Sequence, residues 1–249
     1  MKPKVAFFDF ASCEGCQLAI LDLEDELLDL VNIVEIVNFR EAISERGEDY
    51  EIAFVEGSIS SEHQIERIKE IREKAKLLIT IGACAATGDF QYMSHFFDFE
   101  EVKKYVYGDK AKYFDPILSK PVDFYVKVDF KIPGCPINKY EFLKVVKQII
   151  AGGLPRIYDS PLCSECKLKD NECLLKKGIV CLGPVTRAGC GAICTKNFKG
   201  CFGCRGFAEE FNIESFKNVL KELNLSENEI IEQFKLINGK DIHLITGGK

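Results

Sequence analysis

Cysteine is the residue type in this sequence whose number and spacing point most clearly to chemistry. The chain of 249 residues contains twelve cysteines and three histidines. Four of the cysteines lie in three separate motifs, Cys13-Glu14-Gly15-Cys16, Gly82-Ala83-Cys84-Ala85 and Gly134-Cys135-Pro136. The other eight fall between residues 163 and 204. Thiolates at such spacings bind zinc or iron–sulfur clusters, and a Cys-x-x-Cys pair can also be a redox dithiol.

Each of the three motifs follows a segment that is predicted to be a β-strand. Short apolar runs predict strands at 4–10, 33–39, 51–55, 77–81 and 130–132. Helical periodicity lies between them, at 17–31, from Ser60 or Ser61 to Lys76, and at 138–150. Strands that alternate with helices predict an α/β fold with a doubly wound, parallel, flavodoxin-like sheet.

This fold would bring the four separated cysteines together. The carboxyl ends of parallel strands meet at one edge of the sheet, where ligands bind. Cys13, Cys16, Cys84 and Cys135 should therefore converge there, and a glycine within two residues of each motif's cysteines allows close backbone approach. The spacing leaves three alternatives: an iron–sulfur cluster, a zinc site, or a dithiol at Cys13 and Cys16 that gives the other two no role.

Residues 156–204 differ from the preceding part in composition. Glycine, lysine and proline surround the cysteines with little apolar periodicity, so the segment needs a metal or a cluster to supply its core. Its eight cysteines are Cys163, Cys166, Cys173, Cys181, Cys190, Cys194, Cys201 and Cys204. They divide into two groups of four, for clusters or for zinc. Helical patterns return at 205–249, with a capping box at Ser226 and Glu229, and we predict two domains, 1–155 and 156–249.

Charge and hydropathy restrict the partners and the location of the protein. A net charge of −6 without a long basic run argues against nucleic acid and anionic membrane surfaces as partners. The apolar run at 5–8 is too short for a secretion signal, and no stretch is long enough for a spanning helix. We therefore expect a cytoplasmic protein without membrane insertion. Residues 88–131 are rich in aromatic side chains. This segment is expected either to cover the core or, in part, to form a surface that binds a partner.

Taken together, the motifs resemble those of the small subunit of nickel–iron hydrogenases. The match runs in order through Ser12-Cys13-Glu14-Gly15-Cys16, Gly82-Ala83-Cys84-Ala85, Gly134-Cys135-Pro136 and Cys181-Leu182-Gly183-Pro184-Val185-Thr186. The sequence is similar in particular to the cytosolic subgroup of this family. That subgroup includes the sulfhydrogenase delta subunit and the small subunit of heterodisulfide-reductase-linked hydrogenases. The resemblance implies an electron-transfer subunit of an oxidoreductase acting on dihydrogen, with no catalytic residue of its own. Its implied partners are the large subunit, which holds the nickel–iron centre, and an electron-accepting flavin or iron–sulfur subunit.

The resemblance further implies three 4Fe-4S clusters that use all twelve cysteines. The proximal cluster, nearest the nickel–iron centre and in the flavodoxin-like domain, would be held by Cys13, Cys16, Cys84 and Cys135. The medial and distal clusters would lie in a small, loop-rich iron–sulfur domain with C-terminal helices. Their ligands would be Cys190, Cys194, Cys201 and Cys204 for the medial cluster, and Cys163, Cys166, Cys173 and Cys181 for the distal one. Because imidazole ligation raises cluster potentials, an all-thiolate relay should have a low potential.

Two other functions fit part of the pattern. A subunit of a complex I-like assembly would share the fold but carry one cluster, with adjacent cysteines at its first motif. A zinc-stabilised interaction module would carry zinc and have no redox activity. Among the other residues, Glu14 and Glu56 would tune the proximal cluster, line a proton route, or be ordinary crevice residues. Arg187 would offset the negative charge of the clusters or have a surface role.

Overall fold

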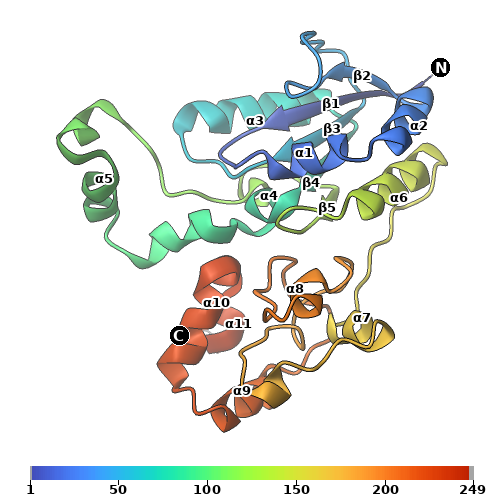
Figure 1. Cartoon of the computed structure of the whole chain (residues 1–249). Helices are drawn as coiled ribbons and strands as arrows, with labels where there is room; N and C mark the ends of the chain where they lie inside the picture. The colour runs from blue at the N-terminus through green and yellow to red at the C-terminus, as the bar shows by residue number, and fades with distance from the viewer. Residues whose placement is uncertain (1, 247–249) are drawn as a thin grey trace. The chain divides into compact units, whose positions relative to one another are not determined.

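The computed structural model describes residues 2–246 and separates the chain into two compact units, Met1–Pro155 and Arg156–Lys249. Met1 and residues 247–249, at the outer ends of the two predicted domains, lie outside the described residues. Each unit has its own apolar core. The first contains the sheet, and the second consists of helices and loops (Figure 1).

The first unit is built on a five-stranded sheet with the order β2-β1-β3-β4-β5. Its strands are β1 (Lys4–Asp9), β2 (Glu35–Asn38), β3 (Ile52–Glu56), β4 (Leu77–Ile81) and β5 (Phe130–Ile132). All neighbouring strands run parallel. This order is that of the flavodoxin-like doubly wound sheet, so the predicted α/β fold class is confirmed.

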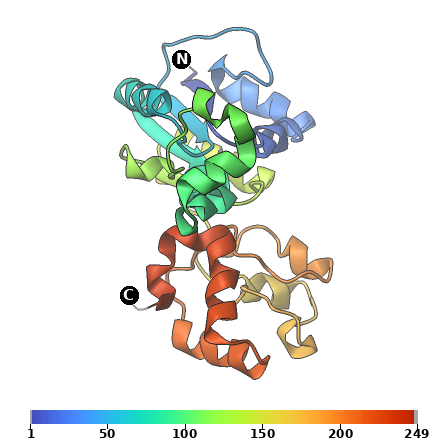
Figure 2. The ribbon, with the colours of Figure 1, turned by 90° about the vertical axis from the view of Figure 1, so that its left-hand side faces the viewer.

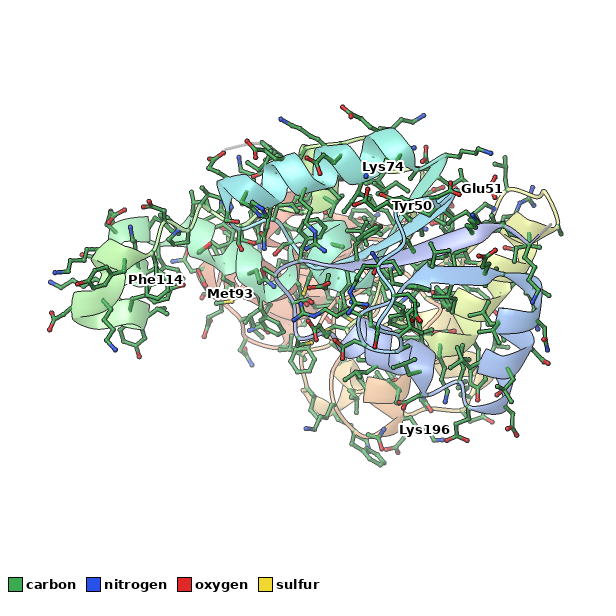
Figure 3. All side chains as sticks on the ribbon, turned by 90° about the horizontal axis from the view of Figure 1, so that it is seen from above. Tyr50, Glu51, Lys74, Met93, Phe114 and Lys196 are labelled. Carbon is green, nitrogen blue, oxygen red and sulfur yellow. The ribbon has the colours of Figure 1, made fainter. Side chains whose placement is uncertain are left out.

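Helices cover both faces of the sheet, with α3 on one side and α1 and α2 on the other (Figure 3). The helices of this unit are α1 (Gly15–Leu21), α2 (Asp25–Ile33), α3 (Glu62–Lys74), α4 (Gly82–Thr87), α5 (Phe99–Tyr107) and α6 (Lys139–Ile150). Phe8 of β1 shares a core cluster with Ile68 of α3. The adjacent Phe7 stacks on Phe54 of β3, which contacts Phe142 of α6 edge to face. Both faces of β1 are buried, which explains its continuous apolar run.

The helix predicted at residues 17–31 is two helices. α1 ends at Leu21 and α2 begins at Asp25, and Glu24 between them adopts a positive φ of 54° that interrupts the helical backbone. Ile20, Leu23 and Leu30 are all buried. Because the apolar pattern continues across the break, periodicity alone predicted one helix.

The aromatic segment at residues 88–131 only partly covers the core. It contains α5 and the 3₁₀ helices η1 (Asp89–Phe96), η2 (Gly108–Tyr113) and η3 (Val122–Phe124). Val122 is buried in the core, but residues 97–114 include no buried side chain, and Tyr105 is 92% exposed. The part that carries Phe114 extends away from the sheet (Figure 3). That it binds a partner stays a prediction.

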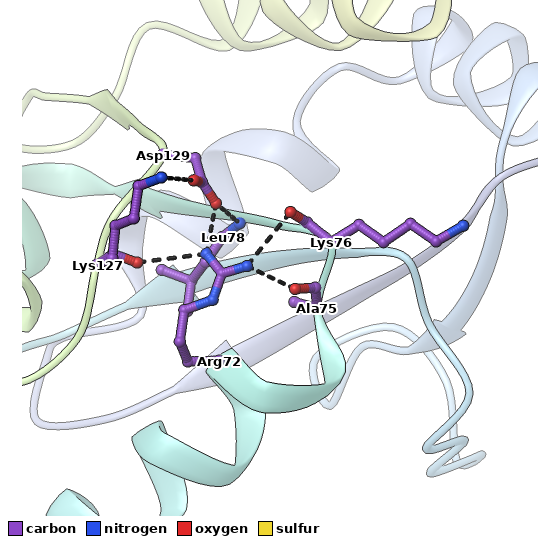
Figure 4. A network of polar contacts seen from close by, with 6 residues as sticks. All are labelled: Arg72, Ala75, Lys76, Leu78, Lys127 and Asp129. Carbon is purple, nitrogen blue, oxygen red and sulfur yellow. Dashed lines mark hydrogen bonds and ion pairs between the residues drawn. The ribbon is translucent and has the colours of Figure 1, made fainter.

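A polar network fixes β5 against α3 and β4 (Figure 4). The Arg72 guanidinium donates to the carbonyls of Ala75 and Lys76 and forms an ion pair with Asp129, which directly precedes β5. The Asp129 carboxylate also accepts the backbone N–H of Leu78 on β4, at 2.9 Å. The network therefore holds the start of the strand that leads to Cys135.

The second unit takes its apolar core from the C-terminal helices. Its elements are α7 (Cys163–Leu168), η4 (Leu175–Lys177), α8 (Ile193–Lys196), α9 (Ile213–Glu222), α10 (Glu227–Asn238), η5 (Gly239–Asp241) and α11 (His243–Thr246). Phe216 of α9 and Phe234 of α10 pack in one cluster with Leu182 and Val185 of the cysteine-rich segment. Figure 2 shows these helices, in red, beside the loops of that segment. The predicted capping box of Ser226 is confirmed.

Of the helices in residues 2–246, none has both the length and the apolar character that a membrane span needs.

Candidate functional site

The four separated cysteines lie on loops at the carboxyl edge of the sheet. Cys13 follows β1, and Cys16 lies in the first turn of α1. Cys84 lies on α4, which begins directly after β4, and Cys135 lies between β5 and α6. The structure therefore places each of them after the carboxyl end of a strand, as the predicted parallel sheet required.

Close backbone contacts bring these loops together. A Cβ atom on Gly82, which has a φ of +86°, would overlap the Cys16 sulfur, so a glycine is needed there. The Ala83 N–H donates to the Gly134 carbonyl at 2.7 Å, which joins the loop after β4 to the loop that carries Cys135. The loops after β1, β4 and β5 thus form one site.

Cys16 is buried and Cys84 half-buried, whereas Cys13 and Cys135 are exposed, and the thiols are close enough to affect one another. The pKa of Cys84 is raised to about 12, mainly by burial and also by the neighbouring Asp89 and Cys13. Burial and the nearby Glu56 likewise raise the pKa of Cys16 well above its usual range. Buried thiolates this close need a positive group between them. The donor set therefore fits a bound iron–sulfur cluster, whose iron would supply that charge.

In the second unit, three other thiols lie around Cys163. The pKa of Cys163 is raised to about 11, mainly by burial and also by the neighbouring Cys181, Cys166 and Cys173. A Cβ atom on Gly183 would lie 3.4 Å from the Cys181 sulfur and 3.7 Å from the Cys163 sulfur. The structure thus brings together the four cysteines that the resemblance assigned to one group.

The remaining four cysteines lie along the next stretch of the same unit. Burial raises the pKa of Cys201, and Cys204 is among the neighbouring thiols that add to the rise. Cys190 precedes α8, and Cys194 lies on it. The place of Cys194 in this group rests on the sequence alone. Within the described part of the chain, no three His, Cys, Asp or Glu side chains are arranged to hold a single metal ion.

Comparison with known proteins assigns the chain to a family. The family model described as NADH ubiquinone oxidoreductase, 20 Kd subunit, matches residues 13–149. Sulfhydrogenase 2 subunit delta of Pyrococcus furiosus is 40% identical over 234 residues, which cover 93% of this chain and 98% of that protein. One chain of the F420-non-reducing hydrogenase vhu of Methanocaldococcus jannaschii is 32% identical, over 94% of this chain and 93% of that protein.

The chain belongs to the family of nickel–iron hydrogenase small subunits. The fold agrees: a chain of an NAD+-reducing [NiFe]-hydrogenase in the H2-reduced state superposes with a TM-score of 0.57 at 22% identity, over 63% of this chain and 96% of that one. As a hydrogenase small subunit, the chain is part of an oxidoreductase that acts on dihydrogen. Membership implies iron–sulfur clusters and a large hydrogenase subunit as partner.

The complex I-like alternative agrees with the family model, but that model matches only part of the chain. The model ends at residue 149, before the eight-cysteine segment. The two hydrogenase relatives match 93% and 94% of the chain and therefore extend through most of the second unit. The first motif of this small subunit also separates its two cysteines by Glu14 and Gly15, rather than placing them adjacent.

Glu56 of this small subunit has a structural role at the site. Its buried carboxylate accepts the backbone N–H groups of Cys16 and Gln17, each at 3.0 Å, and so caps α1 from β3. Burial raises the pKa of Glu56, although these two amides partly oppose the rise. Glu14 precedes α1 in a left-handed conformation, and its own side chain makes no cap. Glu56 supplies that cap instead.

The sequence suggested Arg187 as the arginine beside the clustered thiols. The structure places Arg205 beside one of them, Cys190. Arg187 forms an ion pair with Asp159 at 2.7 Å. Arg205 is 2% exposed and donates from Nε to the Ala188 carbonyl at 2.7 Å. Burial raises the pKa of Cys190, and Arg205 partly opposes that rise. Its position directly after Cys204 was the only sign of this in the sequence.

Asp89 is a second residue that sequence reasoning missed. It follows Cys84 by five residues and is buried, with its carboxylate Oδ2 3.9 Å from the Cys84 sulfur. The Cys135 thiol also hydrogen-bonds to this carboxylate. The spacing of the cysteines gave no reason to select an aspartate.

Proposed function

We propose that this small subunit relays electrons between the nickel–iron centre of the large subunit and an acceptor subunit through three 4Fe-4S clusters. The observation that carries the proposal is the grouping of thiols from distant parts of the chain. Loops after β1, β4 and β5 meet around Cys16 and Cys84 in the first unit. In the second unit, the pKa of Cys163 responds to three other thiols.

The proposed ligand sets use every cysteine of the chain. The proximal cluster would be held by Cys13, Cys16, Cys84 and Cys135, in the domain of residues 1–155. The domain of residues 156–249 would hold the other two clusters. The medial ligands would be Cys190, Cys194, Cys201 and Cys204, and the distal ligands Cys163, Cys166, Cys173 and Cys181. No cysteine is left to bind nickel, so dihydrogen would react in the large subunit.

The two groups of the second unit adjoin each other, which suits electron transfer between them. The backbone N–H of Cys201, a proposed medial ligand, donates to the sulfur of Cys181, a proposed distal ligand, at 3.2 Å. Bound clusters would supply the electron-carrying centres. The chain would supply the positions of the thiolates, and Arg205 would place a buried positive charge beside Cys190.

The ligand type indicates the class of acceptor. A relay held by thiolates alone should have a low potential, since imidazole ligation raises the potential of other clusters. An acceptor subunit that carries a flavin or an iron–sulfur cluster accepts electrons in that range, which supports such a partner.

The first test is the metal content of the anaerobically purified complex. Three 4Fe-4S clusters predict about twelve iron and twelve acid-labile sulfide per small subunit, after subtraction of the iron that the other subunits hold. Electron paramagnetic resonance during a redox titration would then show low-potential centres. Zinc in place of iron and sulfide would contradict the relay, and a distal centre well above the hydrogen couple would contradict a low-potential acceptor.

A further inference from the structure

Asp89 is a buried carboxyl residue at the proposed proximal site, and burial disfavours the charged form of its side chain. The residue is 1% exposed, and its backbone φ of 48° is in the left-handed region, directly after Gly88 at 88°. This turn between α4 and η1 directs the carboxylate at the thiols of Cys84 and Cys135. Aspartate is among the few non-glycine residues that adopt this region readily, so the turn can hold the carboxylate there.

One oxygen of this carboxylate lacks a hydrogen bond of normal geometry. Oδ2 lies near the Cys84 sulfur. Oδ1 is buried and accepts no hydrogen bond of normal geometry, although the nearby Phe90 N–H lowers the pKa of the carboxyl against the effect of burial. A buried polar atom without a partner is costly, and the great majority of such atoms in folded proteins are satisfied. The two thiols that contact Asp89 are themselves proposed iron ligands, and as bound thiolates they would have no S–H to donate. A bound iron would give the carboxylate a partner in their place.

Glu56, the other buried carboxylate at this site, differs in this respect. Both of its oxygens accept backbone N–H groups of α1, at 3.0 Å each. It is therefore committed to the helix, and Asp89 has the oxygen that is available.

We propose that Asp89 is a fifth donor of the proximal site, whose carboxylate can occupy an iron coordination position in place of Cys84 or Cys135. The proposal rests on the proposed proximal cluster. Carboxylate oxygen binds iron in other protein sites. The exchange replaces an Fe–S bond by an Fe–O bond and one monoanionic ligand by another. The displaced sulfur takes up a proton from water, and no electron is transferred.

The test compares single and double variants of the full chain, purified anaerobically in complex with its large subunit. In Cys84→Ala, Asp89 is expected to replace the missing thiolate, so about twelve iron and twelve sulfide per small subunit are retained. The resonance of the proximal centre should change, because one sulfur ligand has become oxygen. Cys84→Ala combined with Asp89→Ala should lose about four iron and four sulfide. Asp89→Ala alone keeps four thiolates and should keep the cluster.

Cys16→Ala is the matched control, because the nearby Glu56 is committed to α1, and this variant should lose about four iron. Since Cys84 lies within the packed α4, Cys135→Ala in the exposed loop provides a second test. If Cys84→Ala and Cys135→Ala both lose as much iron as Cys16→Ala, Asp89 is not a donor. A wild-type complex without a proximal cluster would instead contradict the proposed function itself.

Discussion

At the scale of single residues, the sequence predicts ligands by residue type and misses groups that only folding makes special. Cysteine is uncommon enough that its spacing was informative. Aspartate and arginine are frequent surface residues, so the sequence does not separate Asp89 from its many counterparts, and it marks Arg205 only by its position after Cys204. Their burial, at 1% and 2% exposed, is what marks them. Arg187 drew attention for its place near the cysteines, but the structure pairs it with Asp159.

The proposed relay makes a prediction for Cys16. Cys16→Ala should leave hydrogen–deuterium exchange at the large subunit in place, because the nickel–iron centre is untouched. Reduction of an electron-accepting dye by dihydrogen should fall by about 100-fold or more, since changes even beyond the ligands of a metal site cost about 10–100-fold. Both activities would be measured on the same anaerobic preparation.

A control for this variant lies on the same helix. Leu18 is 49% exposed on α1, and Leu18→Ala should keep both activities near the wild-type values. Dye reduction by Cys16→Ala at the wild-type rate would show that electrons do not pass through the proximal site.

At the scale of elements, the strands were predicted well and the helix boundaries less well. β4 has the predicted bounds, because a short buried strand is largely apolar on both faces. The break between α1 and α2 was missed, since it depends on the backbone of Glu24 and not on the apolar pattern. Polar contacts between elements, such as that of Arg72 with Asp129, join residues 57 positions apart and leave no local signal.

The Arg72 network predicts a loss of stability when it is broken. Burial alone would raise the pKa of Asp129, but the Leu78 N–H and the Arg72 guanidinium outweigh it and lower the pKa. The pair therefore stabilises the fold above the unfolded-state pKa of about 4, and its contribution is lost as the pH falls through the lower folded-state value. At pH 7, Arg72→Ala should reduce the free energy of unfolding by about 1.5–3 kcal/mol, measured by anaerobic thermal unfolding.

Lys127 provides the comparison. Its ammonium also lies 3.7 Å from the Asp129 carboxylate, but its side chain is 85% exposed, against 21% for Arg72. Exposed pairs of this kind contribute about 0–1 kcal/mol. Lys127→Ala should therefore change the midpoint temperature much less than Arg72→Ala, and equal effects would show that the network does not depend on the buried guanidinium.

At the scale of the whole molecule, the sheet could be predicted from the sequence pattern, whereas the arrangement of the cysteine-rich segment could not. Alternating strands and helices imply a parallel sheet, and the carboxyl ends of parallel strands share one edge, where Cys13, Cys84 and Cys135 meet. The second unit has no such repeating rule, because turns and α7 and α8 of six and four residues set its thiols. Its grouping came from the family resemblance. The thiols around Cys163 support that grouping, and the place of Cys194 stays a prediction.

The two-unit organisation leads to a prediction about truncation after residue 155. The first unit has its own core, in which Phe7, Phe54 and Phe142 pack across the sheet, and it holds the whole proposed proximal ligand set. A chain of residues 1–155 should therefore fold, with the far-ultraviolet circular dichroism of an α/β protein. It should bind about four iron and four sulfide instead of about twelve of each. Bound to the large subunit, it should support hydrogen–deuterium exchange but not electron export, because both clusters beyond the proximal one are removed. A folded fragment that binds no iron would contradict the proximal assignment, because all four of its proposed ligands are present.

A fragment that does not fold would show that the first unit needs residues beyond 155, and the proposed domain boundary would then be wrong.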